Sequence, residues 1–334
     1  MSVALIILVI LALIFDFLNG IHDSSNIVAT MISSRAIGPR AALAMTSVAT
    51  LAGPFIFGVA VANTIGNDIV NSEVINLLVI ISALSSAIVW NILTWILGLP
   101  SSSSHAMIGG LLGAVVVGAG FKAIILSGVI KVTIVLFLSP IVGFVAGMLI
   151  ANMIYILSWR ATPRINTTFK RLQVITSLGL ALSHGTNDAQ KTMGIITLGL
   201  VISKVIPTFA VPFWVMAACA GAIAFGTSIG GWQLIKTLGC KFYKIRPVHG
   251  LASQLSSALV ILVASLVGGP VSTTQVVSTS IMGVGAAERI SKVRWKVAGD
   301  IAIAWVITIP ATALLAGGIY WILTTGVPFI IHLF

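Results

Sequence analysis

The chain has 334 residues, of which 58% are hydrophobic and only 7% are charged. An ordinary soluble domain has about 25% charged residues, so the composition excludes a soluble globular protein and predicts a polytopic helical membrane protein. The formal net charge of +11 does not indicate nucleic-acid binding, because the basic residues lie in short connections between apolar runs, where they set the orientation of membrane segments.

Apolar runs recur along the whole chain. A helix needs about 20 residues to cross a hydrocarbon core of about 30 Å, which leaves room for roughly eight to twelve membrane segments. In chain order we expect segments over residues 1–35 and 41–64, a hairpin over 75–120, segments over 123–155, 174–203 and 209–232, a second hairpin over 248–287, and a last segment over 298–324.

The second half of the sequence repeats the first. The matching stretches occur in the same order at nearly constant spacing, and five such matches are not expected by chance. They are Gly20–Asn26 with Gly185–Lys191, Ala62–Gly66 with Gly226–Gly230, Leu84–Ala87 with Leu255–Ala258, Gly98–Ser104 with Gly268–Thr274, and Pro140 with Pro310. We therefore predict a first repeat over 1–156, a short basic cytoplasmic connection over 157–172, and a second repeat over 173–334.

The basic residues predict how the two repeats are oriented. Basic side chains cluster in four short loops, which hold Arg35 and Arg40; Arg160, Arg164, Lys170 and Arg171; Lys236, Lys241, Lys244 and Arg246; and Arg289, Lys292, Arg294 and Lys296. Loops rich in Lys and Arg face the cytoplasm. With these four loops inside, the two repeats have opposite topology and both termini are extracellular.

Two acids lie in the middle of predicted membrane segments, namely Asp23 and Asp188. Acids within a membrane segment are candidates for a functional role, although a buried Asp can also join two helices by hydrogen bonds. Nearby Gly and Asn residues lower the helix preference, so we expect both helices to be broken at mid-membrane depth. Carboxylate, amide and exposed backbone oxygens suit a hard cation such as sodium. The predicted sodium ligands are Asp23, Asn26, Asn187 and Asp188.

Hydroxyl side chains follow a proline at the turn of each predicted hairpin. Pro100 precedes Ser101–Ser104, and Pro270 precedes Ser272, Thr273 and Thr274. Hydroxyl residues at such positions are typical N-caps, and two helix N-termini that face each other would hold a tetrahedral oxyanion. The alternative is that each run is only a polar turn.

Other polar residues near these motifs have two open interpretations. His22, His105 and His184 either relay protons or are structural. Lys191 either faces the anion or pairs with Asp188. No GxSxG or HExxH signature of an intramembrane hydrolase is present, so we expect no enzyme activity. A passive anion channel remains an alternative because it too can use repeated helix ends.

The two Asp motifs resemble the signatures of a known family. Asn19–Asn26 with Ala29 and Thr30, and His184–Lys191, are similar to the two signatures of the inorganic phosphate transporter (PiT) family, which are sodium- or proton-coupled phosphate symporters, in the bacterial form of these signatures. His22 stands where many eukaryotic relatives carry Asn. The resemblance implies an all-α fold of two inverted repeats with two hairpins and about 10–12 membrane segments, and it implies a homodimer.

The same resemblance implies that the signature acids bind the coupling cations and that the hairpin tips bind phosphate. We expect the phosphate ligands to be Ser102, Ser103, Ser104, Ser272, Thr273 and Thr274, with Gln190 or a signature Asp as an acceptor for the protonated oxygen of phosphate. The expected activity is sodium-coupled symport of inorganic phosphate by alternating access across the plasma membrane, without any other cofactor. Coupling to protons and transport of sulfate are the alternatives, since sulfate is also a tetrahedral oxyanion.

Overall fold

A computed structural model describes residues 2–240 and 242–326. Apart from one isolated bridge between Val70 and Ile124, the regular structure in these residues is helical. The α-helices are α1 Val3–Ser33, α2 Pro39–Phe57, α3 Ala60–Asn67, α4 Leu77–Leu97, α5 Ser103–Ala119, α6 Leu126–Leu157, α7 Ile165–Ile202, α8 Phe213–Ile229, α9 Trp232–Cys240, α10 Pro247–Leu266, α11 Thr273–Glu288 and α12 Trp295–Trp321. Short 3-10 turns at Phe121–Ala123 and Ile290–Lys292 and a π turn at Ile322–Gly326 complete the described part.

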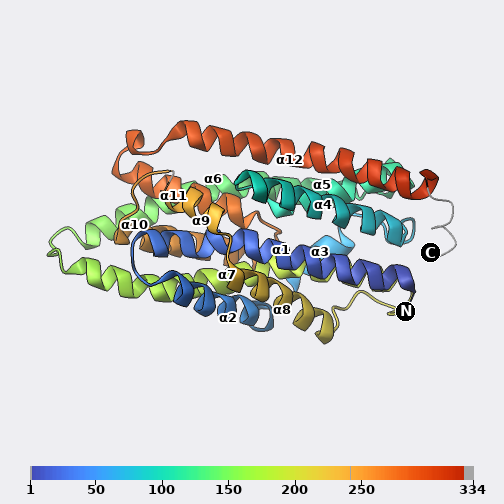
Figure 1. Ribbon diagram of the computed structural model, residues 1–334, viewed down its shortest axis with the longest axis horizontal. Coiled ribbons are helices and arrows are strands. Elements are labelled where there is room, and N and C mark those ends of the chain that lie inside the picture. Colours follow the sequence, from blue (N-terminus) through green and yellow to red (C-terminus); the bar gives the residue numbers. More distant parts are fainter. Residues whose placement is uncertain (1, 241, 327–334) are drawn as a thin grey trace.

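The helices run along the long axis of an elongated bundle (Figure 1). Six of the described helices, α1, α2, α4, α6, α10 and α12, are long and apolar enough to cross a membrane, and the α8–α9 pair, bent by 72°, makes a seventh if it counts as one span. The longest helix, α7 with 38 residues, is not among them, because its centre carries the polar run His184–Lys191. These features confirm the predicted all-α polytopic membrane fold.

The expected helix breaks at the two Asp motifs are wrong. Both α1 and α7 continue through Asp23 and Asp188. The hydroxyls of Ser24 and Ser25 donate to carbonyls three residues earlier in the same helix, at 2.7 and 3.0 Å, so these two hydroxyls are satisfied without opening the backbone. The breaks lie instead at Gly58 and Gly230, which end α2 and α8 with a φ of 80° each.

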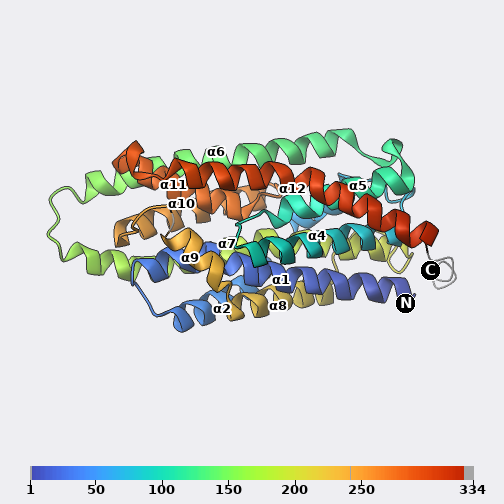
Figure 2. The same cartoon turned by 45° about the horizontal axis from the view of Figure 1, so that its top comes forward.

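The described helices form two sets of six in the same order, α1–α6 and α7–α12. Corresponding pairs pack alike: α1 packs on α8 as α7 packs on α2, and α5 packs on α12 as α11 packs on α6. In both views α1 and α7 run in opposite directions along the bundle, as do α6 and α12 (Figures 1 and 2). Each half therefore packs its hairpin against the last helix of the other half.

This order corrects one of the sequence matches. Ala62–Gly66 lies in α3, whereas Gly226–Gly230 lies at the end of α8. The helix that corresponds to α3 is α9, because both follow a glycine break. The helix-free link between the halves spans residues 158–164 and is shorter than the predicted connection over 157–172, since residues 165–172 are already helical in α7.

Glycines allow the closest helix crossings. A Cβ on Gly20 of α1 would lie 2.1 Å from the carbonyl oxygen of Ile223 in α8, and a Cβ on Gly185 of α7 would lie 2.1 Å from that of Thr50 in α2. Small residues let two backbones approach in membrane bundles, where lipid is as apolar as the side chains and packing rather than the hydrophobic effect drives association. These crossings hold the centres of α1 and α7 inside the bundle.

The loops that are rich in basic residues lie toward one end of the bundle. The four basic loops lie together at one end, and α1 begins and α12 ends at the other (Figure 2). At the basic end Glu288 closes the base of the second hairpin, accepting hydrogen bonds from Arg246 at 2.5 Å, His249 at 2.9 Å and Lys292 at 2.6 Å. Partial burial alone would raise the pKa of Glu288, but the hydrogen bonds from Lys292 and His249 and the charge of Arg246 lower this pKa to about 2.

Candidate functional site

The two hairpin tips meet near the middle of the bundle (Figure 2). Each tip turns through a glycine with positive φ, Gly98 at 64° and Gly268 at 73°, a conformation that glycine adopts without steric cost. Ser102 then caps α5 and Ser272 caps α11, which confirms the predicted N-caps. The tips touch where the Ser104 hydroxyl donates to the carbonyl oxygen of Val271 at 3.0 Å.

The first centre consists of Asp23, Asn26 and Thr274. The Asn26 amide donates to Asp23 Oδ1 at 2.7 Å and to Thr274 Oγ1 at 3.0 Å. The Thr274 hydroxyl in turn donates to Asp23 Oδ1 at 2.8 Å. This centre therefore joins the middle of α1 to the tip of the second hairpin.

The second centre consists of Asp188, Lys191 and Ser104. Lys191 Nζ forms an ion pair with Asp188 Oδ1 and donates to Ser104 Oγ at 2.5 Å and to the carbonyl oxygen of Val271 at 2.8 Å. The Thr273 hydroxyl donates to the other Asp188 oxygen at 2.9 Å. The three protons of the ammonium group thus have three acceptors, and Lys191 contacts both hairpin tips.

Histidine lies between the two centres. His184 Nε2 is 2.9 Å from Asp188 Oδ2 and 3.6 Å from Asp23 Oδ2. Ligand atoms of Asp23, His184 and Asp188 all lie within 4.8 Å of one another. His22 Nδ1 is 3.7 Å from Asp23 Oδ1, and His105 Nδ1 is 2.7 Å from the hydroxyl of Ser102. The two centres therefore belong to one polar site.

Two predicted site residues have other partners. The Asn187 amide donates to Ser265 Oγ at 2.8 Å and to the carbonyl oxygen of Gly269 at 3.2 Å, and so ties α7 to the second hairpin. The Gln190 amide donates to the carbonyl oxygen of Gly58 at 2.5 Å, and its oxygen accepts from the backbone of Val61 at 2.7 Å. Gln190 therefore bridges the break between α2 and α3 rather than the hairpin tips.

The structure thus brings six predicted residues into direct contact around the tips, namely Asp23, Asn26, Ser104, Asp188, Thr273 and Thr274. Ser102, Ser103 and Ser272 are buried at the same tips. Sequence reasoning missed the Val271 carbonyl and the Ser265 hydroxyl. A backbone carbonyl carries no residue-type signal, and a single serine in an apolar helix is a weak one.

The site is closed and contains unused oxygen atoms. Its acids, amides and hydroxyls are at most 4% exposed, so in this conformation neither side of the membrane reaches it. Among the described residues, Asp23 Oδ2, Asn26 Oδ1 and Asn187 Oδ1 have no hydrogen-bond partner. Buried polar atoms without partners are costly, and oxygen ligands of this kind suit a small hard cation.

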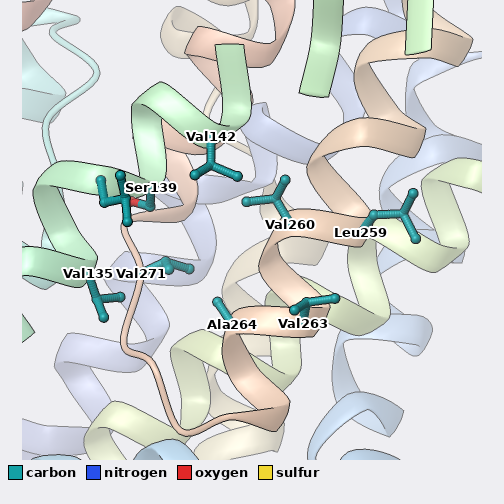
Figure 3. Close-up of a pocket in the computed structure, with 9 residues that line it drawn as sticks. Val135, Ser139, Val142, Leu259, Val260, Val263, Ala264 and Val271 are labelled. Carbon is teal, nitrogen blue, oxygen red and sulfur yellow. The ribbon is translucent and has the colours of Figure 1, made fainter. Parts of the chain in front are cut away.

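A separate apolar cavity lies beside one tip. It has a volume of about 370 Å³ and is formed by α6, α10 and Val271. Figure 3 shows valine and leucine side chains around it, with Val271 on the loop of the second hairpin. Ser139 is its single polar side chain, and the Ser139 hydroxyl donates to a carbonyl of its own helix at 3.1 Å. Without donors, this cavity does not suit an oxyanion.

Comparison with known proteins places these features in context. The model of the phosphate transporter family matches residues 19–316. A protein of Bacillus subtilis (strain 168), named "Probable low-affinity inorganic phosphate transporter", is 45% identical over 323 residues, which is 95% of this chain and 96% of that protein. A Rhizobium meliloti (strain 1021) protein of the same name is 43% identical over 94% of this chain and 95% of its own length.

One solved structure shares the fold. The structure described as "The sodium-dependent phosphate transporter" superposes with a TM-score of 0.89 and 24% identity, covering 96% of this chain and 99% of that one.

Proposed function

Since this chain belongs to the phosphate transporter family, we propose that it is a secondary active transporter that carries inorganic phosphate together with a coupling cation, by alternating access. The observation that carries the proposal is the contact of the second hairpin tip with both buried acids, through Thr273 and Thr274, while the first tip contacts Lys191 through Ser104. Inverted repeats that meet at a central ion site are the usual architecture of such transporters.

Phosphate is proposed to bind between the hairpin tips. The ligands would be the hydroxyls of Ser102, Ser103, Ser104, Ser272, Thr273 and Thr274 together with the N-termini of α5 and α11. Helix N-termini hold anions through free N–H groups and a positive dipole end. In the closed conformation the tips contact each other through Ser104 and Val271, so phosphate entry requires the tips to separate. We leave Gln190 out of this ligand set, because backbone groups of the α2–α3 break occupy its amide.

Sodium is the proposed coupling cation, with oxygen ligands from Asp23, Asn26, Asn187 and Asp188. Three of these side chains have an oxygen without a partner among the described residues, and the solved neighbour is described as sodium-dependent. A carboxylate in a site of low dielectric constant repels an anion strongly. A bound cation removes this repulsion, so that phosphate entry depends on the cation.

Protons are the second candidate for the coupling cation. The observation in their favour is the position of His184, whose Nε2 atom lies within 3.6 Å of oxygens of both acids. A histidine in such a place can carry a proton between two carboxylates.

The proposal extends to the arrangement in the membrane. We propose a homodimer in the plasma membrane with extracellular termini and with repeats over 1–156 and 173–334. The gathering of the basic loops at one end of the bundle supports the orientation, whereas the homodimer rests on the family resemblance.

The test is uptake of radiolabelled phosphate into proteoliposomes at a fixed membrane potential, with an inward gradient of either sodium or protons. We expect a sodium gradient to drive accumulation above equilibrium, and excess unlabelled sulfate to compete poorly. If only the proton gradient drives accumulation, the coupling cation is the proton and not sodium. Uptake that only equilibrates would favour the passive channel, and strong competition by sulfate would overturn the phosphate assignment.

A further inference from the structure

The two centres of the site are built alike on the two halves of the chain. Asn26 and Lys191 each follow a signature acid by three residues and occupy matching positions in the repeat. Asn26 donates to Asp23 and to Thr274 of the second hairpin. Lys191 contacts Asp188 and donates to Ser104 of the first hairpin. Ser104 and Thr274 also occupy matching positions in the repeat. Each centre therefore consists of an acid and a hydrogen-bond donor from one half of the chain and a hydroxyl from the hairpin of the other half.

The chemical difference between the centres is one charge. The donor in the first centre is a neutral amide, and the donor in the second is an ammonium group that is 2% exposed. In the first centre Asp23 Oδ2 and Asn26 Oδ1 have no hydrogen-bond partner among the described residues. In the second centre both oxygens of Asp188 are engaged, Oδ1 by Lys191 and Oδ2 by Thr273. The first centre thus offers oxygens to a cation, and the second already contains one.

Charge balance gives this difference a consequence for coupling. With His184, which lies between the two acids, in its neutral form, two carboxylates at the centre of a membrane require about two positive charges before an anion can approach at low cost. The ammonium group of Lys191 supplies one of them permanently, and its contact with Ser104 and with the Val271 carbonyl places this charge at both tips. One mobile cation at Asp23 then completes the balance.

We propose that Lys191 is a tethered replacement for a coupling cation, so that the protein uses a single mobile cation site, at Asp23, for each phosphate. This inference rests on the proposed function and deepens it, because it states how many cations the site takes and which residue decides the number. It also narrows the proposed sodium ligands to those around Asp23, because Lys191 and Thr273 engage the oxygens of Asp188. The sequence left open whether Lys191 pairs with Asp188 or faces the anion. In this proposal it does both, because it pairs with Asp188 and its charge faces the space where the tips meet.

The test is the ratio of coupling cation to phosphate in proteoliposomes, measured from the accumulation of phosphate at zero membrane potential. A tenfold cation gradient supports about tenfold accumulation of phosphate with one cation per phosphate and about 100-fold with two. The reason is that each cation transported with phosphate down a tenfold gradient contributes enough free energy for one further factor of ten in phosphate concentration. We expect about tenfold for the unmodified protein. Lys191→Asn, which makes the two centres alike, is expected to raise accumulation toward 100-fold.

Two further variants control the test. Lys191→Arg keeps the charge and is expected to keep the ratio of the unmodified protein. Asn26→Lys places a second tethered charge beside Asp23 and is expected to abolish cation-driven accumulation while phosphate still equilibrates. If Lys191→Asn folds but does not transport, cation titration of its melting temperature replaces flux: a two-site dependence supports the proposal, and a one-site dependence overturns it.

The proposal and the function on which it rests fail differently. If the unmodified protein accumulates no phosphate, the proposed function is wrong. If it accumulates phosphate while Lys191→Asn shows an unchanged ratio, or Asn26→Lys still accumulates phosphate with the cation gradient, then the tethered charge is wrong and the transporter assignment stands.

Discussion

At the scale of single residues, the site depends on two hydroxyls of the second hairpin tip, each of which donates to a signature acid. Thr274 donates to Asp23, from which it is 251 residues distant, and Thr273 donates to Asp188. Each hydroxyl satisfies a buried carboxylate that would otherwise lose a partner at a cost of about 1–3 kcal/mol. Moving the second hairpin tip away would therefore remove a hydrogen bond from each carboxylate.

Thr274→Val is expected to lower phosphate uptake, because it removes the hydroxyl from Asp23 while keeping the shape of the side chain. A lost partner worth about 1–3 kcal/mol corresponds to a rate that is roughly fivefold to 150-fold lower. Initial uptake in proteoliposomes measures this effect. Thr279→Val on the same helix is the matched control, since the Thr279 hydroxyl donates to the carbonyl of Gln275 in its own helix. Equal rates for the two variants would contradict the role of Thr274.

At the scale of elements, the helices that carry the acids are held by close crossings. The sequence predicts breaks in these helices, but α1 and α7 stay continuous and the glycines serve to bring α8 and α2 against them. Because Gly20 and Gly185 each precede the signature acid by three residues, each crossing fixes the acid close to the centre of the bundle. Continuous helices hold the acids in place, and the hairpins are left as the elements that must separate.

Gly185→Ala is expected to lower the melting temperature of the purified protein, because the added Cβ would lie 2.1 Å from the carbonyl oxygen of Thr50. Gly179→Ala on the same helix is the control. A Cβ at Gly179 meets nothing within 4 Å, so this change is expected to leave stability unchanged or to raise it by about 0.5–1 kcal/mol through helix propensity. Equal destabilisation by both variants would show that the crossing is not the cause.

At the scale of the whole molecule, the charges predict one orientation in the membrane. The basic loops gather at one end of the bundle, and the connection between α3 and α4, whose sequence includes Asp68 and Glu73, lies toward the other. Loops rich in Lys and Arg remain in the cytoplasm during insertion. The two halves then cross the membrane in opposite directions. A motion of one hairpin toward one side of the membrane therefore corresponds, by the same symmetry, to a motion of the other hairpin toward the opposite side.

Single cysteines placed in exposed loops test this orientation, in a background in which Cys219 and Cys240 are replaced by serine. A membrane-impermeant maleimide added to intact cells is expected to label Glu73→Cys and not Ala161→Cys. Both positions are exposed in the structure, so Ala161→Cys is expected to react once the cells are permeabilised. Labelling of Ala161→Cys alone in intact cells would reverse the proposed orientation.

The sequence by itself determined the all-helical membrane class, the two hairpins with N-capping hydroxyls after Pro100 and Pro270, and the repeated acids, because these depend on apolar run length and on local hydrogen bonding. The tertiary structure decided what those residues touch. Lys191 bridges Asp188 and both tips, and Gln190 bridges a helix break instead of the tips. It also decided that α1 and α7 remain unbroken, since the serines of α1 donate within their own helix and the hairpin tips supply further partners through Thr274, Thr273 and Ser104. Contacts between residues eighty or more positions apart leave no local pattern, and only the packing of the helices reveals them.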